Sequence, residues 1–233
     1  MKPILPFSWS GYDAYHTCPR QYYELKLARN FPEIPHESML WGKDVHKALE
    51  LNVTEDKPLT ERFAQFNPLM LKLKASPGDK YAELELAVNS QLEICDFNDP
   101  EAWSRGVDDL AIINGHKAVS LDYKTGKKKP FSRQLELSAC RLFTKFPQVT
   151  NITTSFAWLA TKEWTTAHYT RDQLPYLWEG FYEGVKQMLW SEENNTWPAK
   201  PSGLCKRSKR PGSTYAGCPV ATCPHSEYYR RGR

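Results

Sequence analysis

The sequence predicts one mixed α/β core followed by a small cysteine-rich segment. The chain has 233 residues and is 40% hydrophobic, enough to bury a single good core. The hydrophobic period is helical at first and changes to two near Tyr81, and the segment that begins at Pro198 has no clear period. We therefore expect a main domain over 1–197 and a cysteine-rich basic tail over 198–233.

The first part of the chain is expected to be helical. One helix should start near Ser10, with Asp13 as its capping-box partner, and run to about Leu27 with a break at Cys18-Pro19. A second is expected from Met39 to Leu51, with Ser38 as N-cap.

A third helix is expected over Pro58–Ala75, bent near Asn67-Pro68. Alternating apolar residues then predict strands at Tyr81–Asn89, Gln91–Phe97, Ser104–Ile113, Lys117–Thr125 and Ile152–Ala160. Helices fit Ser132–Phe146 and Asp172–Glu192. Helices, a run of strands, then helix, strand and helix indicate a mixed α/β domain.

Charge and hydropathy restrict the setting in which the protein works. No apolar run is long enough for a signal peptide or a membrane span, so a cytoplasmic protein without membrane contact is expected. The net charge is +4, but seven basic residues and one acid lie between Cys205 and Arg233. This distribution fits either a polyanionic partner or a solvated, partly disordered end.

The hairpin signal at Asn114-Gly115 is the most informative local feature. With Ile113 opposite His116, Asp109 would face Ser120. Because alternate strand residues share a side, Asp122 and Lys124 would then lie on the same face as Asp109. Two adjacent carboxylates repel unless a cation lies between them, and oxygen ligands suit Mg²⁺ or Mn²⁺. An exposed sheet face with an ordinary Asp–Lys pair is the alternative.

Two further residues could complete such a site. His46 lies on the second predicted helix, one turn after Gly42, whose missing side chain would leave room for a metal or phosphate. Glu83, on the strand expected at Tyr81–Asn89, could add another carboxylate. A lone helical histidine and an exposed strand glutamate are the alternatives.

In chain order, these residues resemble the RecB-like branch of the PD-(D/E)XK nuclease superfamily, which includes compact phage and CRISPR-associated exonucleases. The motifs that carry the resemblance are Cys18-Pro19-Arg20-Gln21-Tyr22-Tyr23, Gly42-Lys43-Asp44-Val45-His46, Ala82-Glu83, Arg105-Gly106-Val107-Asp108-Asp109, Asp122-Tyr123-Lys124-Thr125-Gly126 and Gln134-Leu135. The resemblance implies a restriction-endonuclease-like core with a central mixed sheet flanked by helices.

The resemblance also assigns roles. His46, Asp109, Asp122 and the carbonyl of Tyr123 would bind one or two catalytic metals, and Lys124 would act on the attacking water. Gln134 would contact the active site or the DNA backbone, although Ser138 stands where the family has an aromatic residue. Asp108 beside Asp109 is an ambiguity that the family spacing resolves toward Asp109. The DNA contacts expected besides Gln134 are Lys127, Lys128, Lys129, Arg207 and Arg210.

The six cysteines fall into two groups. Cys95 and Cys140 sit in apolar patterns and read as small buried hydrophobes, whereas the others stand beside turn-forming or charged residues. Relatives with a [4Fe–4S] cluster have one ligand near the N-terminus and three near the C-terminus, a layout that is matched by Cys18, Cys205, Cys218 and Cys223. The cluster would join the tail to the first helix. Zinc held by the last three cysteines and His225 is the alternative.

The sequence therefore predicts a metal-dependent deoxyribonuclease, an exonuclease sooner than an endonuclease, acting on single strands or duplex ends. DNA processing, repair or phage recombination in a bacterial or host cytoplasm would fit, with a helicase, recombinase or single-strand-binding protein as partner. The alternatives are a catalytically inactive DNA-binding or scaffolding module of the same fold, an endonuclease and, more remotely, an enzyme that acts on RNA.

Overall fold

A computed structural model describes residues 6–32, 37–128, 132–208 and 217–229, which divide into two compact units. The described residues of Met1–Pro6 and Pro35–Phe181 form the first unit. Those of Phe7–Ile34 and Tyr182–Arg233 form the second.

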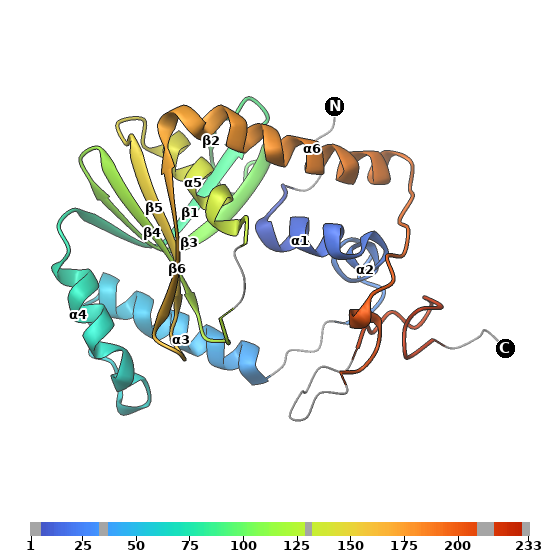
Figure 1. Cartoon of the computed structure of the whole chain (residues 1–233), viewed down its shortest axis with the longest axis horizontal. Coiled ribbons are helices and arrows are strands. Elements are labelled where there is room, and N and C mark those ends of the chain that lie inside the picture. Colours follow the sequence, from blue (N-terminus) through green and yellow to red (C-terminus); the bar gives the residue numbers. More distant parts are fainter. Residues whose placement is uncertain (1–5, 33–36, 129–131, 209–216, 230–233) are drawn as a thin grey trace. The chain divides into compact units, whose positions relative to one another are not determined.

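A six-stranded sheet forms the centre of the first unit (Figure 1). Its strands are β1 (Asp79–Asn89), β2 (Ile94–Cys95), β3 (Ala102–Asn114), β4 (Lys117–Lys124), β5 (Asn151–Trp158) and β6 (Glu163–Thr170). They lie in the order β2-β1-β3-β4-β5-β6. Only β4 and β5 pair in parallel, and helix α5 (Gln134–Lys145) connects them. The expected mixed α/β class is therefore confirmed.

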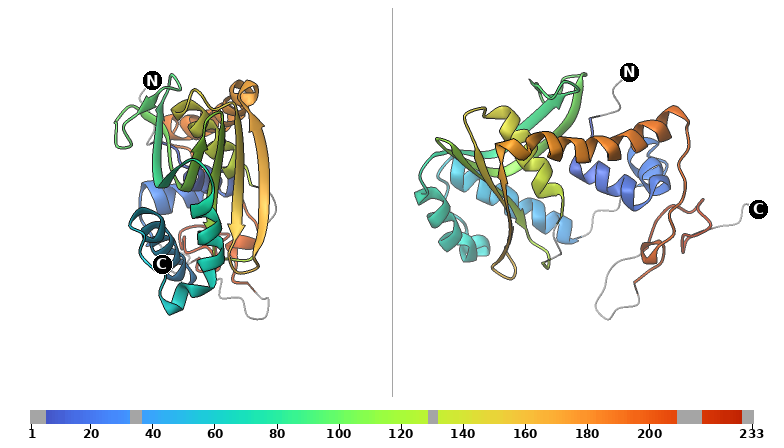
Figure 2. Two further views of the ribbon diagram at one scale, coloured as in Figure 1. Left: turned by 90° about the vertical axis from the view of Figure 1, so that its left-hand side faces the viewer. Right: turned by 45° about the horizontal axis from the view of Figure 1, so that its top comes forward.

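Helices cover the two faces of this sheet (Figures 1 and 2). On one face, α3 (Glu37–Thr54), the 3-10 helix η2 (Glu61–Phe66) and α4 (Asn67–Ala75) bury their apolar side chains against β3 and β4. On the other face, Ala139, Leu142 and Phe143 of α5 pack against β1, β3, β4, β5 and β6. After the short η3 (Arg171–Gln173), α6 (Leu174–Glu193) follows the last strand.

Most of the expected elements are present, with corrected limits. The helical N-cap near the start is Ser8, whose side chain accepts a hydrogen bond from the backbone of Gly11. Ser38 lies inside α3 instead of capping it. The strand expected over Gln91–Phe97 is reduced to β2, because a turn follows Asn89.

Strand β6 was not expected from the sequence. It is an edge strand, and most of its residues are exposed or half-buried, so it lacks the apolar alternation that identifies a strand. Its side chains pair with β5 through hydroxyl groups, as in the 3.0 Å contact between Ser155 and Thr166.

The β3–β4 hairpin also differs from the expected register. Asn114 lies opposite Lys117 and Ile113 opposite Ala118, so the two turn residues are Gly115 and His116. Gly115 has φ +58°, which suits the first central position of a type II′ turn, where glycine is favoured. The turn is therefore one residue later than the sequence suggested.

The second unit contains α1 (Trp9–Thr17), α2 (Pro19–Tyr22), the π-helical turn η1 (Tyr23–Leu27) and the short 3-10 helix η4 (Gly203–Cys205). Pro19 at the start of α2 accounts for the expected break after Thr17, because proline is tolerated only at the beginning of a helix. The Tyr15 hydroxyl bonds to Ser191 at 2.7 Å, and Trp197 stacks on Tyr23 with ring centroids 5.0 Å apart. Among the helices that the structure describes, none has the length and apolar character needed to cross a membrane.

Candidate functional site

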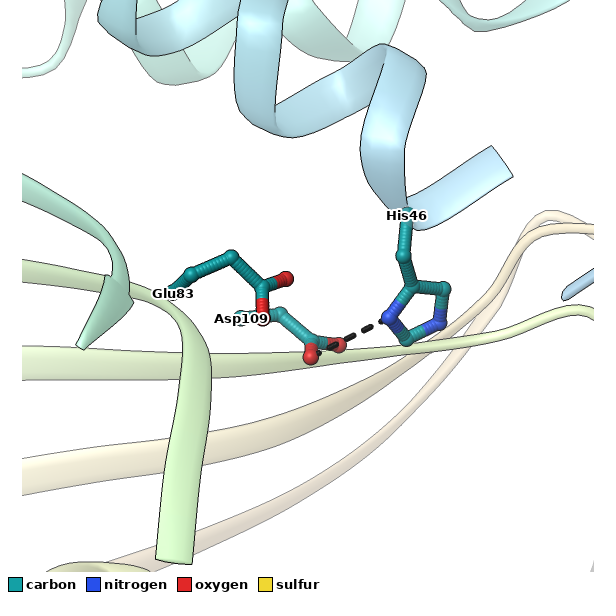
Figure 3. Close-up of side chains that lie close together, drawn as sticks. All are labelled: His46, Glu83 and Asp109. Atoms are coloured by element: carbon teal, nitrogen blue, oxygen red, sulfur yellow. Dashed lines mark ion pairs between the residues drawn. The ribbon is translucent and has the colours of Figure 1, made fainter. Parts of the chain in front are cut away.

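His46, Glu83 and Asp109 converge from three different elements of the first unit (Figure 3). One nitrogen of His46 and one carboxylate oxygen from each acid all lie within 4.8 Å of one another. His46 projects from α3, and its Nδ1 is 3.2 Å from Oδ1 of Asp109. All three side chains are half-buried. This set of one imidazole and two carboxylates fits a divalent metal ion.

A coupled irregularity in β1 and β3 directs the two acids toward α3. The ladder pairs Ala82 with Leu110 and Leu84 with Asp108, but Glu83 and Asp109 between them are not paired. Glu83 has φ +47°, a left-handed conformation that is rare for residues other than glycine.

The irregularity reverses the side-chain alternation in both strands. Tyr81 contacts Phe146 and Leu84 packs in the same apolar cluster, so residues three positions apart lie on the α5 side of β1. On β3, Asp108 and Ala111 likewise both face α5. Regular alternation would put each pair on opposite faces, so it cannot predict where Asp109 points.

The backbone of Tyr123 joins this cluster to β4. The β3–β4 ladder ends at Leu110 opposite Leu121, which leaves the next backbone groups on this side of β4 without partners on β3. The N–H of Tyr123 donates to Oδ2 of Asp109 at 2.5 Å, and its carbonyl lies 2.8 Å from Nε2 of His46. Side chains from β3 and α3 thus take the place of a continuing ladder.

Asp122 and Lys124, the residues before and after Tyr123 on β4, form a second polar group together with Gln134. The ammonium of Lys124 is 2.8 Å and 2.9 Å from the two carboxylate oxygens of Asp122. Gln134, the first residue of α5, donates its amide to Asp122 and accepts from Lys124 at 3.2 Å. The Lys124 ammonium also lies 4.8 Å from the centre of the Phe156 ring. An acid, a lysine and an amide are therefore held together by mutual contacts.

The expectation that Asp109 and Asp122 share one sheet face was wrong. Asp109 contacts His46 of α3, whereas Asp122 contacts Gln134 of α5. Asp109 reaches into the gap between β3 and β4 because its carboxylate binds a backbone N–H, which lies in the plane of the sheet. Asp122 does not belong to the three-residue ligand group.

The two groups interact electrostatically. Burial, followed by the Asp109 charge, raises the pKa of Asp122 to about 7, although Lys124 and His46 oppose this. Burial and Asp109 also raise the pKa of Glu83. Burial alone would lower the pKa of His46, but the hydrogen bond and charge of Asp109 raise it above its usual value. The site thus concentrates more negative charge than its own cations neutralise, a condition that favours a bound cation.

A Cβ at Gly42 would fit without a close contact. A side chain there would first meet the hydroxyl of Thr125, 3.4 Å from the position of its Cβ. This is an ordinary van der Waals distance, so packing does not require a glycine at this position.

The DNA contacts expected besides Gln134 belong to both units, and two of them lie outside the described residues. Lys127 is exposed, and Lys128 forms a 3.2 Å ion pair with Glu163. Arg207 belongs to the second unit, where its backbone N–H donates to Glu227. Lys129 and Arg210 lie outside the described residues.

Cys18, Cys205, Cys218 and Cys223 line one pocket of the second unit, together with His225. Three of the thiols lie close to N–H groups: Lys200 N is 3.4 Å from Cys18 Sγ, Ser202 N is 3.4 Å from Cys205 Sγ, and Gln21 Nε2 is 3.6 Å from Cys218 Sγ. Among the described residues, no three of these thiols and His225 bring their ligand atoms within 4.8 Å of one another.

A buried network around Asp108 was not anticipated. Its carboxylate accepts hydrogen bonds from Ser120 at 2.8 Å and Ser138 at 2.6 Å and lies 3.8 Å from Arg141. The clue in the sequence was the spacing of Gln134, Ser138 and Arg141, which puts them on one side of a helix. The structure thus separates the two neighbouring acids: Asp109 faces His46, and Asp108 faces α5.

Comparison with known proteins adds support for the fold. No family model and no curated protein matches the sequence. A crystal structure of a provisionally named exonuclease from Eubacterium rectale aligns over 89% of this chain and 91% of its own, with a TM-score of 0.53 and 15% identity. A structure named SSO0001 aligns over 80% of this chain and 78% of its own, with a TM-score of 0.42 and 15% identity. The similarity to the first protein is one of fold.

Proposed function

We propose that the protein is a metal-dependent deoxyribonuclease, and an exonuclease sooner than an endonuclease. One observation carries the proposal: the His46–Glu83–Asp109 cluster and the Asp122–Lys124–Gln134 group meet at Tyr123, at one end of β4. The fold similarity to the provisionally named exonuclease supports the same reaction class.

The chain's own residues would divide the work of phosphodiester hydrolysis. His46 and Asp109, with Glu83 and the Tyr123 carbonyl beside them and Asp122 nearby, would hold Mg²⁺ or Mn²⁺. The cation would supply positive charge that polarises the phosphate and acidifies water. Lys124 would orient the attacking water or stabilise charge on the phosphate, and Gln134 would keep Lys124 and Asp122 in place.

The test is an assay of the purified protein on end-labelled DNA with Mg²⁺ or Mn²⁺. Asp122→Ala and Lys124→Ala should each reduce the rate by a factor on the order of 10² or more, because each removes a group at the reacting centre. Lys117→Ala is the control, since this lysine is an exposed residue at the opposite end of the same strand. Equal rates in all four proteins would exclude the proposed site.

The shape of the DNA substrate separates the two kinds of nuclease. An exonuclease should leave covalently closed circular DNA intact and degrade the same DNA once it is linear. Cleavage of the closed circle would indicate an endonuclease. Metal-independent DNA binding without hydrolysis of either form would indicate a binding module.

We further propose that the four pocket cysteines bind an iron–sulfur cluster. The support is their convergence on one pocket and the N–H groups that lie close to three of the thiols. The cluster would covalently link residues from both ends of the chain within the second unit. Iron, sulfide and visible absorbance in anaerobically purified protein would support this proposal, and stoichiometric zinc without iron would contradict it.

A further inference from the structure

The buried network around Asp108 lies directly beside the candidate catalytic groups but contains none of them. Asp108 and Ser138 are 4% and 6% exposed, and Ser120 is 3% exposed. The network connects three elements, because Asp108 belongs to β3, Ser120 to β4 and Ser138 to α5. It therefore fixes a helix to the two strands that carry the site.

Polar residues on successive turns of α5 contact these two strands. Gln134 in its first turn contacts Asp122 and Lys124, and Ser138, four residues later, contacts Asp108 and Ser120. Arg141 follows after three more residues. Residues at this spacing lie on one side of a helix, so the side of α5 that holds Gln134 is the side bound to Asp108.

The charge of Asp108 has a second partner in Arg141. The Arg141 guanidinium is buried, and two of its nitrogens, Nε and Nη1, have no hydrogen-bond partner among the described residues. Its ion pair with Asp108, at 3.8 Å, is therefore its main compensation. Gly106 makes room for it, because a Cβ on Gly106 would lie 2.6 Å from the guanidinium.

Polar and apolar contacts fix different properties of the helix. Apolar packing of Ala139, Leu142 and Phe143 holds α5 against the sheet, but such packing has no preferred direction. Hydrogen bonds are directional, so those of Ser138 determine how far α5 is shifted or rotated along β4. A small shift would move the Gln134 amide away from both Asp122 and Lys124.

We infer that Asp108 and Ser138 are positioning residues that hold Gln134 in contact with Asp122 and Lys124. This inference rests on the proposed nuclease function. The Ser138 hydroxyl contacts Asp108 and Ser120, which are neither metal ligands nor Lys124, so it acts through the helix. Its effect on the reaction should therefore depend entirely on Gln134.

The test compares Ser138→Ala, Gln134→Ala and the double variant by their kcat and KM on end-labelled DNA with Mn²⁺. Ser138→Ala should lower kcat about tenfold with little change in KM, the equivalent of one buried hydrogen bond. The double variant should have the kcat of Gln134→Ala alone, because the serine acts through the glutamine. Ser120→Ala, which leaves Asp108 one hydroxyl donor fewer, should behave like Ser138→Ala.

Thr144→Val is the control, since the one hydrogen bond of the Thr144 hydroxyl to a described residue goes to the backbone carbonyl of Cys140 in the same helix. It should keep the kcat of the unmodified protein. An unchanged kcat in Ser138→Ala, or effects that multiply in the double variant, would overturn the inference while the nuclease proposal stands. An unmodified protein that hydrolyses no DNA with either metal would overturn both.

Discussion

At the scale of single residues, Glu83 combines an unfavourable backbone with a position in the candidate metal site. Its φ of +47° costs an L-residue roughly 1–2 kcal/mol, and such outliers concentrate at functional sites. The conformation turns the carboxylate toward His46 and Asp109. A requirement for the Glu83 carboxylate in the metal site would therefore explain why the strained backbone is retained.

Glu83→Gly and Glu83→Ala separate strain from function. Both should lose nuclease activity, because both remove the carboxylate. Glycine adopts positive φ freely, so Glu83→Gly should be more stable than Glu83→Ala by about 1 kcal/mol in urea unfolding. Alanine as stable as glycine would show that the backbone at this position is not left-handed.

The raised pKa values of the site predict how stability changes with pH. Burial and Asp109 raise the pKa of Asp122 to about 7 from 3.8, and the pKa of Glu83 and His46 are also above their ordinary values. Because these pKa values are higher in the folded protein than in the unfolded chain, the folded protein binds more protons in this pH range. In EDTA, the free energy of unfolding should therefore fall as pH rises from about 4 through about 7.

Mn²⁺ should reduce this fall, since it neutralises the same carboxylates. The measurement is urea unfolding at several pH values, with Asp122→Asn as the comparison. The free energy of unfolding of Asp122→Asn should depend less on pH than that of the unmodified protein. An identical pH dependence in the two proteins would show that Asp122 does not contribute to it.

At the scale of elements, a glycine on β3 and a glycine on α3 differ in how much room their neighbours leave for a side chain. A Cβ on Gly106 of β3 would lie 2.6 Å from the buried Arg141 of α5, whereas one on Gly42 of α3 would lie 3.4 Å from Thr125. Arg141 has little freedom to move, because it is buried and paired with Asp108. Only the first glycine is required by packing.

Gly106→Ala should therefore destabilise the protein by about 1–3 kcal/mol through overpacking. Gly42→Ala should be neutral or stabilising by up to about 1 kcal/mol, because alanine is a better helix former than glycine. Thermal or urea unfolding of both variants gives the comparison. The opposite ranking would place the close contact at α3 instead of α5.

At the scale of the whole molecule, each compact unit contains one candidate centre. The His46–Glu83–Asp109 cluster and the Asp122–Lys124–Gln134 group lie in the first unit, and the four pocket cysteines lie in the second. A cluster bound by the four cysteines would join Cys18, in the early helices, to residues near the end of the chain. Linking segments so distant in sequence removes much conformational freedom from the unfolded chain.

Cys18→Ser should remove the iron and visible absorbance and lower the temperature of unfolding, with nuclease activity lost only as the protein unfolds. Cys95→Ser is the matched control, because Cys95 lies on β2 of the first unit and is not one of the residues that line the pocket. Metal analysis, absorbance and calorimetry would be compared. Full iron content in Cys18→Ser would exclude this cysteine as a ligand.

The sequence by itself determined the mixed α/β class, most of the elements and the residue types of the site. Apolar periodicity identifies helices and strands locally, and Asp122 and Lys124 share a face because β4 is regular. The break at Pro19 was also readable, because proline acts on its own local backbone. These features depend on neighbours in sequence.

Only the tertiary structure decided how the acids are arranged. The unpaired Glu83 and Asp109 reverse the alternation of β1 and β3, and the one-residue shift of the hairpin alters which residues lie opposite one another. Asp109 points toward His46 because the ladder ends and leaves the backbone of Tyr123 to be satisfied. Pairing between distant strands and the satisfaction of buried backbone groups are properties of the assembled sheet, so no local pattern contains them.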